Sequence, residues 1–493
     1  MKRIFAAVAC AAALVIAGST QAQIRPLPVQ GILIGLRPAS QATVEQRARV
    51  QALQAQPGAG ELNIARLQTD NLRNAAAGQT VQFQVTPQRS IAARALSVQT
   101  SGGITTWRGE VPGQGNRPPG TATIVMNSTG VMGTIHGADG RTYRLRPLPG
   151  GETAIVELNY ATMPPDHDDA GGGSGGLAQL RNPVIRAQIN PGVVTPNTTG
   201  ILSPTDNRAR VATTPNTTGI VTPTEDLSDT GVSRRLAGNA NLLQLATRPS
   251  NVSLIERYRI NPEIWRLLRP PTIDVLVAFT PGAQSFTGDM NLFATQAIEE
   301  TNGSFINSNV WARVRLVGTM SVSYSESGRD YPTMVDHLTV NGDGQIDTVH
   351  AQRDALRADV VVLVVHQPAK CGRAREINAT AAQAFVVVQW DCATGYYSFG
   401  HEIAHLAGAR HDEPSDTTDT PYAWGHGFRH LAAAPNGWRT IMGYRCESNL
   451  CEPRLQYWSS PLTMWNGLPM GTAADADNRR VWNDRAATVA GFR

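Results

Sequence analysis

The sequence predicts a mixed α/β domain over residues 270–493, preceded by a small antiparallel β domain. Residues 79–159 contain short segments in which apolar and polar positions alternate, as in half-buried antiparallel strands. Turn residues separate these segments. From about residue 270 strand-like and helix-like segments alternate, and residues 358–366 contain an unbroken apolar run typical of a buried strand. Residues 164–269 between them are rich in Pro, Thr and Gly, which favours a flexible linker.

The first residues have the composition of a secretory signal. Two basic residues precede an apolar run over residues 4–17, and residues 20–22 fit a small-x-small cleavage site. We expect residues 1–22 to be removed and the mature protein to be secreted, that is, extracellular or periplasmic in transit. No later stretch is long and apolar enough to span a membrane, so we expect no membrane association after signal removal.

Residues 23–163 are expected to form one domain with a helical start and a β unit. Helical stretches are predicted around residues 41–75, where Gln, Ala and Arg predominate. Strands are predicted at residues 121–126, 130–135, 142–146 and 153–158. In the linker, two copies of a seven-residue unit, at 195–201 and 214–220, are too few and too polar to build a solenoid.

The C-terminal part has a regular order of predicted elements. Strands are expected at residues 273–279, 312–324, 358–366 and 385–390, and helices at 289–307, within 343–357 and at 394–407. Asp289 is a plausible N-cap of the first of these helices. Residues 341–347 resemble a calcium-binding loop without its full acidic spacing, so a turn before the next helix is favoured and a calcium ion is not excluded.

Charge and cysteine content narrow the class of protein. The formal charge of +4 is small for 493 residues and argues against a nucleic-acid binder. Four cysteines follow the signal: Cys371, Cys392, Cys446 and Cys451. An even number in an exported chain indicates disulfides, and we favour Cys371–Cys392 and Cys446–Cys451 among three connectivities because these pairs flank the helix at 394–407.

Residues 401–411 read His-Glu-x-x-His-x-x-Gly-x-x-His. On a helix His401 and His405 lie one turn apart on the same face. Gly408 permits a sharp exit from the helix, which allows His411 to return as a third nitrogen ligand. Three histidines and one open position are typical of a catalytic zinc ion, and Glu402 is expected to act as general base on the attacking water. The alternative is a surface helix with solvated side chains, which the fixed glycine and third histidine disfavour.

Three further residues belong to this hypothesis. Met442, in Thr440–Tyr444, is expected to form a methionine turn beneath the metal; ordinary core packing is the alternative. Tyr444 is a candidate for oxyanion stabilisation or a fifth ligand, and a packed tyrosine fits equally well. Asp412 is expected to anchor the backbone below the site rather than touch substrate.

From Thr272 to Arg493 the chain resembles the bacterial peptidyl-Asp metalloendopeptidases, a reprolysin-like branch of the metzincin zinc proteases. The matching segments are Asp391–Glu402, Gly408–Asp412, Tyr422–Gly427, Arg439–Tyr444, Tyr457–Pro461 and Gly467–Gly471. The resemblance implies a metzincin-like catalytic domain: a twisted, mostly parallel sheet with an antiparallel edge strand, a zinc helix and a C-terminal subdomain. It also implies that residues 385–390 form the edge strand that pairs with extended substrate.

The same resemblance implies cleavage of proteins or peptides on the N-terminal side of Asp. The region around Thr106–Glu110 and the β unit are similar to zinc-protease propeptides, so we expect the protein to be made as a zymogen. Recognition of Asp requires a cation, for which the candidates are Arg439, Arg445 and Arg454. Self-processing is then expected at the linker aspartates Asp166, Asp168, Asp169, Asp206, Asp226 and Asp229, which we expect to lie in exposed chain.

Two other functions stay open at this point. One is a secreted reprolysin-like protease of different specificity, and the other a secreted binding protein with a degenerate protease domain. The intact Glu402 argues against the second. We expect the protein to be a monomer.

Overall fold

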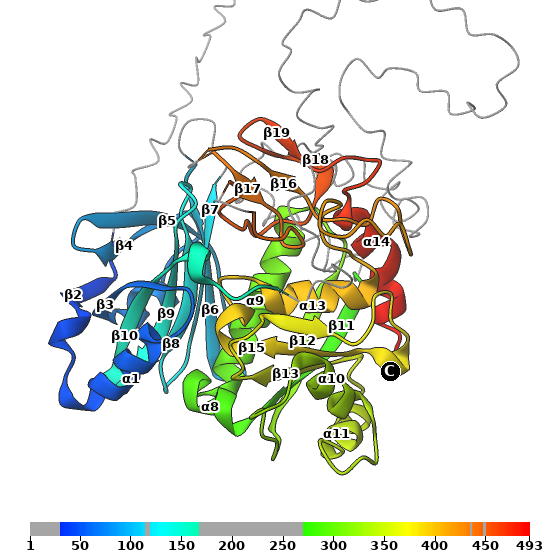
Figure 1. Cartoon of the computed structure of the whole chain (residues 1–493). Helices are drawn as coiled ribbons and strands as arrows, with labels where there is room; N and C mark the ends of the chain where they lie inside the picture. The colour runs from blue at the N-terminus through cyan, green and yellow to red at the C-terminus, as the bar shows by residue number, and fades with distance from the viewer. Residues whose placement is uncertain (1–29, 114–118, 167–269, 434–435, 447–449) are drawn as a thin grey trace, which may run out of the picture.

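The computed structural model describes residues 30–113, 119–166, 270–433, 436–446 and 450–493. Two sheets lie on opposite sides of helix α9, Met290–Asn307, which contacts β7 and β8 of the first sheet and β12 of the second (Figure 1). Asp289 caps α9 as predicted, with its side chain accepting from the Leu292 N–H at 3.0 Å. The signal segment and residues 167–269 of the predicted linker lie outside the described residues.

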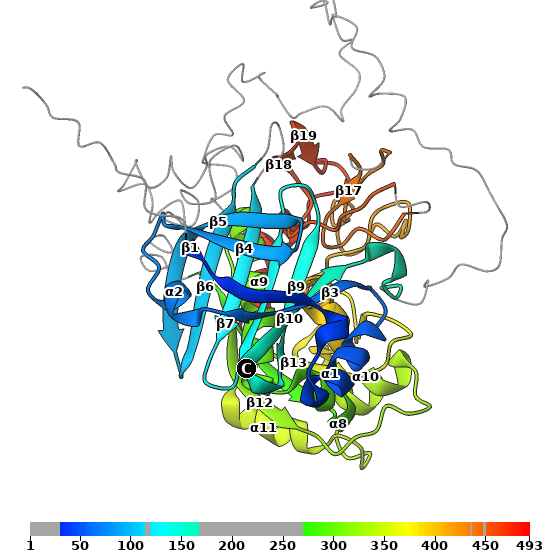
Figure 2. The same cartoon turned by 90° about the vertical axis from the view of Figure 1, so that its left-hand side faces the viewer.

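The N-terminal sheet has ten strands in the order β1-β4-β5-β6-β7-β8-β9-β10-β3-β2, and Figure 2 looks onto it. The strands are Gln30–Gly31, Leu33–Pro38, Ala59–Leu67, Thr80–Thr86, Arg89–Ser101, Ile104–Val111, Gly120–Met126, Val131–His136, Thr142–Leu148 and Glu152–Leu158, numbered β1 to β10. All neighbours pair antiparallel except β1 with β4. The antiparallel β unit is thus confirmed, and it begins before residue 79.

The helical prediction for residues 41–75 is wrong in its middle. Helices α1, Val44–Gln54, and α2, Thr69–Arg73, flank strand β3, which pairs with β10 on one side and β2 on the other. Leu62 and Ile64 of β3 are buried in the same cluster as Val50 and Leu53 of α1. Pairing on both edges of β3 overrides the helical composition of the segment, as tertiary context commonly does.

The C-terminal sheet has five strands in the order β12-β11-β13-β15-β14. They are β11 Thr272–Phe279, β12 Arg313–Ser321, β13 Val360–Val365, β14 Gly372–Ala374 and β15 Phe385–Gln389. The first three and β15 pair parallel, whereas β14 pairs antiparallel with β15 at the edge. Among the described residues, the other α-helices are α8 Pro281–Thr287, α10 Tyr331–Thr339, α11 Thr348–Leu356, α12 Trp390–Ala393, α13 Ser398–Ala407 and α14 Asn478–Val489. Two small antiparallel pairs join β16 Arg429–His430 to β17 Trp438–Arg439 and β18 Ser460–Trp465 to β19 Leu468–Met470.

The edge strand is not the one expected. Residues 385–389 form β15, which lies between β13 and β14 and is buried along its whole length. A strand of five buried residues gains most from neighbours on both sides, whereas β14 carries the half-buried Arg373 and suits an edge. The edge strands of this sheet are therefore β12 and β14, and β14 is the one that pairs antiparallel.

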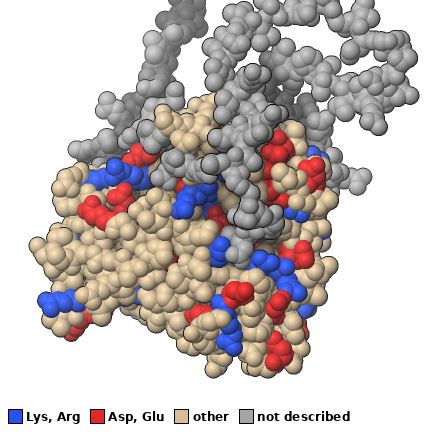
Figure 3. Space-filling model, in the orientation of Figure 1, with Lys and Arg blue, Asp and Glu red and all other residues tan. Residues whose placement is uncertain are grey.

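The two halves share one core. Apolar residues of β3, β7, β8 and β10 pack in the same cluster as those of α9, the C-terminal sheet and α13. No helix in the described ranges has the length and apolar character needed to cross a membrane. Acidic and basic side chains are interspersed on the face in Figure 3, and neither charge forms a continuous stripe among the residues described there.

Both predicted disulfides are present, Cys371–Cys392 and Cys446–Cys451. The first ties the residue before β14 to α12 across a sequence separation of 21 residues. Replacing both Cys371 and Cys392 by Ser is expected to lower the free energy of unfolding by about 3 kcal/mol, because the unfolded chain regains loop entropy. Denaturant titration of the double variant tests this, and an unchanged midpoint would contradict it.

Candidate metal centre

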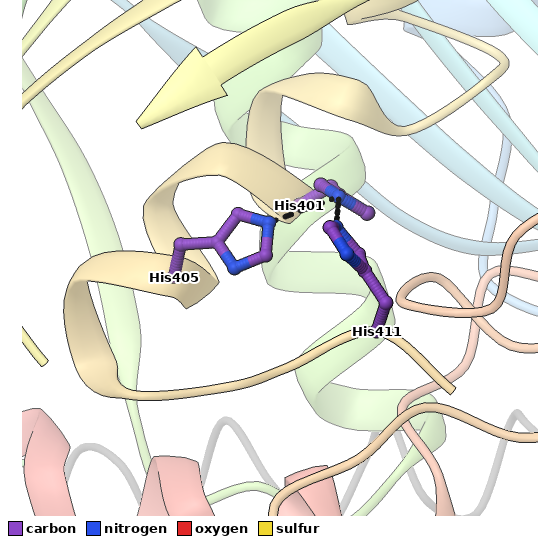
Figure 4. A group of neighbouring side chains, drawn as sticks. All are labelled: His401, His405 and His411. Carbon is purple, nitrogen blue, oxygen red and sulfur yellow. Dashed lines mark hydrogen bonds between the residues drawn. The ribbon is translucent and has the colours of Figure 1, made fainter. Parts of the chain in front are cut away.

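Helix α13 carries His401 and His405, and the turn at its C-terminal end sets the position of His411. The helix stops at Gly408, whose φ of 107° lies in the left-handed region that residues with a Cβ avoid. A Cβ at Gly408 would also lie 3.1 Å from the side chains of Pro421 and Tyr422. The chain therefore turns sharply after α13, and His411 returns toward the helix (Figure 4).

His401, His405 and His411 meet at one point. The Nε2 atom of His401 lies 3.2 Å from Nε2 of His405 and 3.2 Å from Nε2 of His411. The three potential ligand atoms all lie within 4.8 Å of one another, and Figure 4 shows the rings turned toward a common centre. The structure thus brings together the three residues that the sequence motif selects.

The other side of two rings faces backbone carbonyls. His405 Nδ1 lies 2.8 Å from the Ala409 carbonyl, and His401 Nδ1 lies 2.9 Å from the Ile441 carbonyl. When Nδ1 donates its proton to a carbonyl, Nε2 presents a lone pair. Converging lone pairs repel unless they share a cation, so the donor set fits a metal ion such as zinc.

Burial favours a neutral imidazole at His405. Burial lowers the pKa of His405 to about 4, and the Ala409 carbonyl only partly opposes this shift. At neutral pH the ring is therefore uncharged, which is the form that binds metals.

Glu402 lies on the same helix next to His401 and is completely buried. A Cβ on Gly372 would lie 2.4 Å from the Glu402 Oε1 atom, so strand β14 can pass this carboxylate only with glycine at that position. Burial raises the pKa of Glu402 well above its usual range, and the Asp166 carboxylate raises it further. A buried carboxylate with a raised pKa beside a three-histidine cluster is suited to proton transfer.

Asp412 holds the segment below the cluster. Its Oδ1 accepts from the Tyr444 N–H at 2.7 Å, and its Oδ2 lies 2.7 Å from Arg429 Nε and 2.9 Å from Ser415 Oγ. Met442 is fully buried in the turn that this contact fixes. Asp412 therefore anchors backbone, as the sequence suggested.

Sequence reasoning missed His426. Its Nδ1 lies 2.8 Å from the carbonyl of His411, so it positions the residue that carries the third ring. The ring of His426 is completely buried. The available signal was a histidine between Gly425 and Gly427, which gives no spacing pattern of its own.

Tyr444 lies against the cluster. Its ring centroid is 4.0 Å from that of His411. Replacement of Tyr444 by Phe keeps this ring contact and removes only the hydroxyl. We expect turnover to fall by about a hundredfold to a thousandfold with little change in metal content, the loss expected for one oxyanion donor. Equal kcat in the two proteins would assign Tyr444 to packing alone.

Two family models match the chain. The model of metallo-peptidase family M12 (Reprolysin_5) covers residues 269–459, and the BamI lipocalin-like domain covers residues 40–159. A peptidyl-Asp metalloendopeptidase of Stenotrophomonas maltophilia (strain R551-3) is 33% identical over 94% of this chain and 97% of its own length. The chain belongs to the peptidyl-Asp metalloendopeptidase family.

Two other members of this family give the same result. A protein of that name from Xanthomonas campestris pv. campestris is 32% identical over 98% of this chain and 97% of its own length. Another, from Stenotrophomonas maltophilia (strain K279a), is 46% identical over 45% of this chain and 53% of its own length. The chain is accordingly a metalloendopeptidase with a reprolysin-like domain and a lipocalin-like β domain.

The three candidate arginines of this peptidase have different environments. Arg439 forms an ion pair with Glu452 at 2.5 Å and donates to the Tyr396 hydroxyl at 2.8 Å. Arg445 donates to backbone carbonyls of the segment 160–163. Arg454 forms an ion pair with Asp166 at 2.9 Å, and both side chains are buried.

Asp166 is thus not in exposed chain, contrary to the sequence-based expectation. Its exposed fraction is 4%, and the backbone of Pro165 and Asp166 is bonded to the residues around the start of β14. The composition of the linker gave no sign of this, because the partners of Asp166 are hundreds of residues away in sequence. The other linker aspartates lie outside the described residues.

Proposed function

We propose that this metalloendopeptidase is a zinc enzyme, made as a secreted zymogen, that hydrolyses peptide bonds on the N-terminal side of Asp. The observation that carries the zinc assignment is the convergence of the Nε2 atoms of three histidines, next to the buried carboxylate of Glu402. Two of these histidines have a backbone carbonyl at Nδ1. The preference for Asp is supported by the names of the full-length relatives.

His401, His405 and His411 would hold the ion through Nε2. When bound, zinc would polarise a peptide carbonyl as a Lewis acid and lower the pKa of a coordinated water toward about 7. Glu402 would take a proton from the attacking water at a carboxylate oxygen and return it to the departing amine nitrogen. The hydroxyl of water then ends on the acyl carbon, and its proton on the new amino terminus. Asp412 and His426 keep Tyr444 and His411 in place during these steps.

A zymogen is supported by the position of the lipocalin-like domain. It shares a core with the catalytic part, and its last described residues lie along β14, beside Glu402. Self-processing at aspartates of residues 164–269 would release this domain. Secretion is supported by the signal-like start of the chain and by two disulfides, which persist in oxidising compartments.

The preference is tested by sequencing the products of a denatured protein substrate. We expect most new amino termini to begin with Asp, and the processed enzyme itself to begin at a linker aspartate. A wide scatter of terminal residues would favour a protease of different specificity. Unchanged processing in a chain with Glu402→Gln would reject self-processing.

A further inference from the structure

The guanidinium of Arg454 lies at the base of the candidate metal centre. Its Nε and Nη2 atoms donate to the Ile441 carbonyl at 2.9 and 2.5 Å, and Nη2 lies 2.7 Å from His401 Nδ1. For His401 to bind a metal through Nε2, Nδ1 must carry the proton and share the Ile441 carbonyl with Arg454. One edge of the guanidinium is thus fixed against the backbone below the histidine cluster.

The other edge holds a carboxylate. Nη1 of Arg454 donates to Asp166 Oδ1 at 2.9 Å and to the Tyr396 carbonyl at 3.1 Å. The Tyr396 ring lies under the guanidinium at 4.6 Å, and Arg439 in turn donates to the Tyr396 hydroxyl. Arg454, Tyr396 and Ile441 all belong to the catalytic domain, whereas Asp166 belongs to the segment that leaves the lipocalin-like domain. We call the group formed by Arg454, Tyr396 and Ile441 the carboxylate pocket.

Two backbone hydrogen bonds hold the segment that delivers Asp166 against the start of β14. The Cys371 N–H donates to the Pro165 carbonyl at 2.9 Å, and the Gly372 N–H donates to the Asp166 carbonyl at 3.2 Å. Main-chain bonds to an exposed sheet edge, with a side chain in a pocket, are a common way to recognise extended peptides. The same Gly372 packs against Glu402, so the segment passes the groups expected to carry out hydrolysis.

Arg445 binds the backbone of residues 160–163, which lead into this segment. Its Nη1 donates to the carbonyls of Tyr160, Ala161 and Met163 at 3.4, 2.7 and 3.1 Å. All three contacts are to backbone atoms, so Arg445 fixes the path of the chain without binding a side chain. The carboxylate at the end of that path meets Arg454 instead.

We propose that Arg454 is the specificity-determining residue, which receives the aspartate side chain of a substrate, and that Asp166 occupies this place in the uncleaved chain. The proposal rests on the proposed endopeptidase function and identifies the residue behind its preference. When Asn takes the place of Asp in the substrate, the buried guanidinium of Arg454 has no carboxylate partner. Because an unpaired buried charge is costly, the substrate with Asn binds more weakly.

The test measures peptide binding in chains with Glu402→Gln, which cannot process themselves. The probe is a fluorescent peptide with Asp at its centre, compared with the same peptide carrying Asn. Adding Asp166→Ala is expected to raise affinity for the Asp peptide by at least tenfold, and to raise affinity for the Asn peptide much less. The control adds Arg108→Gln to the Glu402→Gln chain in place of Asp166→Ala. It removes another ion pair between the two halves, that of Arg108 with Glu299 on α9, and is expected to change the affinity for neither peptide.

A third substitution examines the pocket itself. Arg454→Gln, added to the Glu402→Gln and Asp166→Ala chain, is expected to abolish the preference for Asp over Asn. If that variant does not fold, Arg454→Lys keeps the charge without the planar fork and is expected to reduce the preference partially. Equal affinity with and without Asp166, or an Asp preference that survives loss of Arg454, would overturn the proposal. Absence of metal-dependent cleavage by the otherwise native chain would instead overturn the proposed function, because the binding assay needs no turnover.

Discussion

Replacement of Glu402 by Gln is expected to lower kcat by about a thousandfold while the metal content stays that of the native chain. The amide keeps the size of the side chain in a buried position but cannot accept a proton from water. General-base groups contribute about a hundredfold to ten-thousandfold to such reactions. The three histidines are untouched, so metal analysis and peptidase assays on the same sample separate binding from chemistry.

A matched control is Glu326→Gln. Glu326 is partly buried beside the residues just after β11 and β13, where it accepts from the Thr280 hydroxyl and the His366 N–H and lies outside the histidine cluster. The control loses a carboxylate of the same type away from the histidine cluster and is expected to retain turnover within about twofold. Undiminished proteolysis by the Glu402 variant would reject its assigned role.

Replacement of Asp412 by Ala is expected to lower the free energy of unfolding by about 3 kcal/mol. The substitution removes the acceptor of the Tyr444 N–H and leaves the Arg429 guanidinium without its carboxylate. Because Asp412 also fixes the turn below the ligands, metal affinity is expected to fall by about tenfold to a hundredfold. Denaturant unfolding and competition with a chelator measure the two effects.

The neighbouring Asp416 offers a comparison. Its ion pair with Arg410 lies 2.8 Å apart and is more exposed than that of Asp412. Asp416→Ala is expected to cost about 1 kcal/mol and to leave metal affinity unchanged. Equal losses in the two variants would show that Asp412 has no special link to the metal centre.

Local patterns in the sequence predicted the features that depend on nearby residues. The i, i+4 spacing of His401 and His405 and the glycine at 408 bring the cluster together because both act within a few residues. The N-cap at Asp289 is local in the same sense. The pairing of the four cysteines followed from their positions around α13.

Features that depend on distant residues were not accessible in this way. Strand β3 was mistaken for helix because its neighbours, β10 and β2, are set by the whole sheet. Residues 385–389 were placed at the edge because nothing in their own sequence reveals that Gly372–Ala374 pairs beyond them. The burial of Asp166 depends on Arg454, 288 positions further along the chain, so only the structure brings the two together.

Metal content and cleavage, measured on one preparation before and after chelation, test the central claim most directly. The account predicts about one zinc ion per chain, loss of peptide cleavage when a chelator removes it, and recovery when zinc is restored. His411→Ala is expected to lose both the ion and the activity. Cleavage that survives complete removal of the metal would contradict the account. So would a zinc-loaded chain that cuts no peptide after its N-terminal domain has been released.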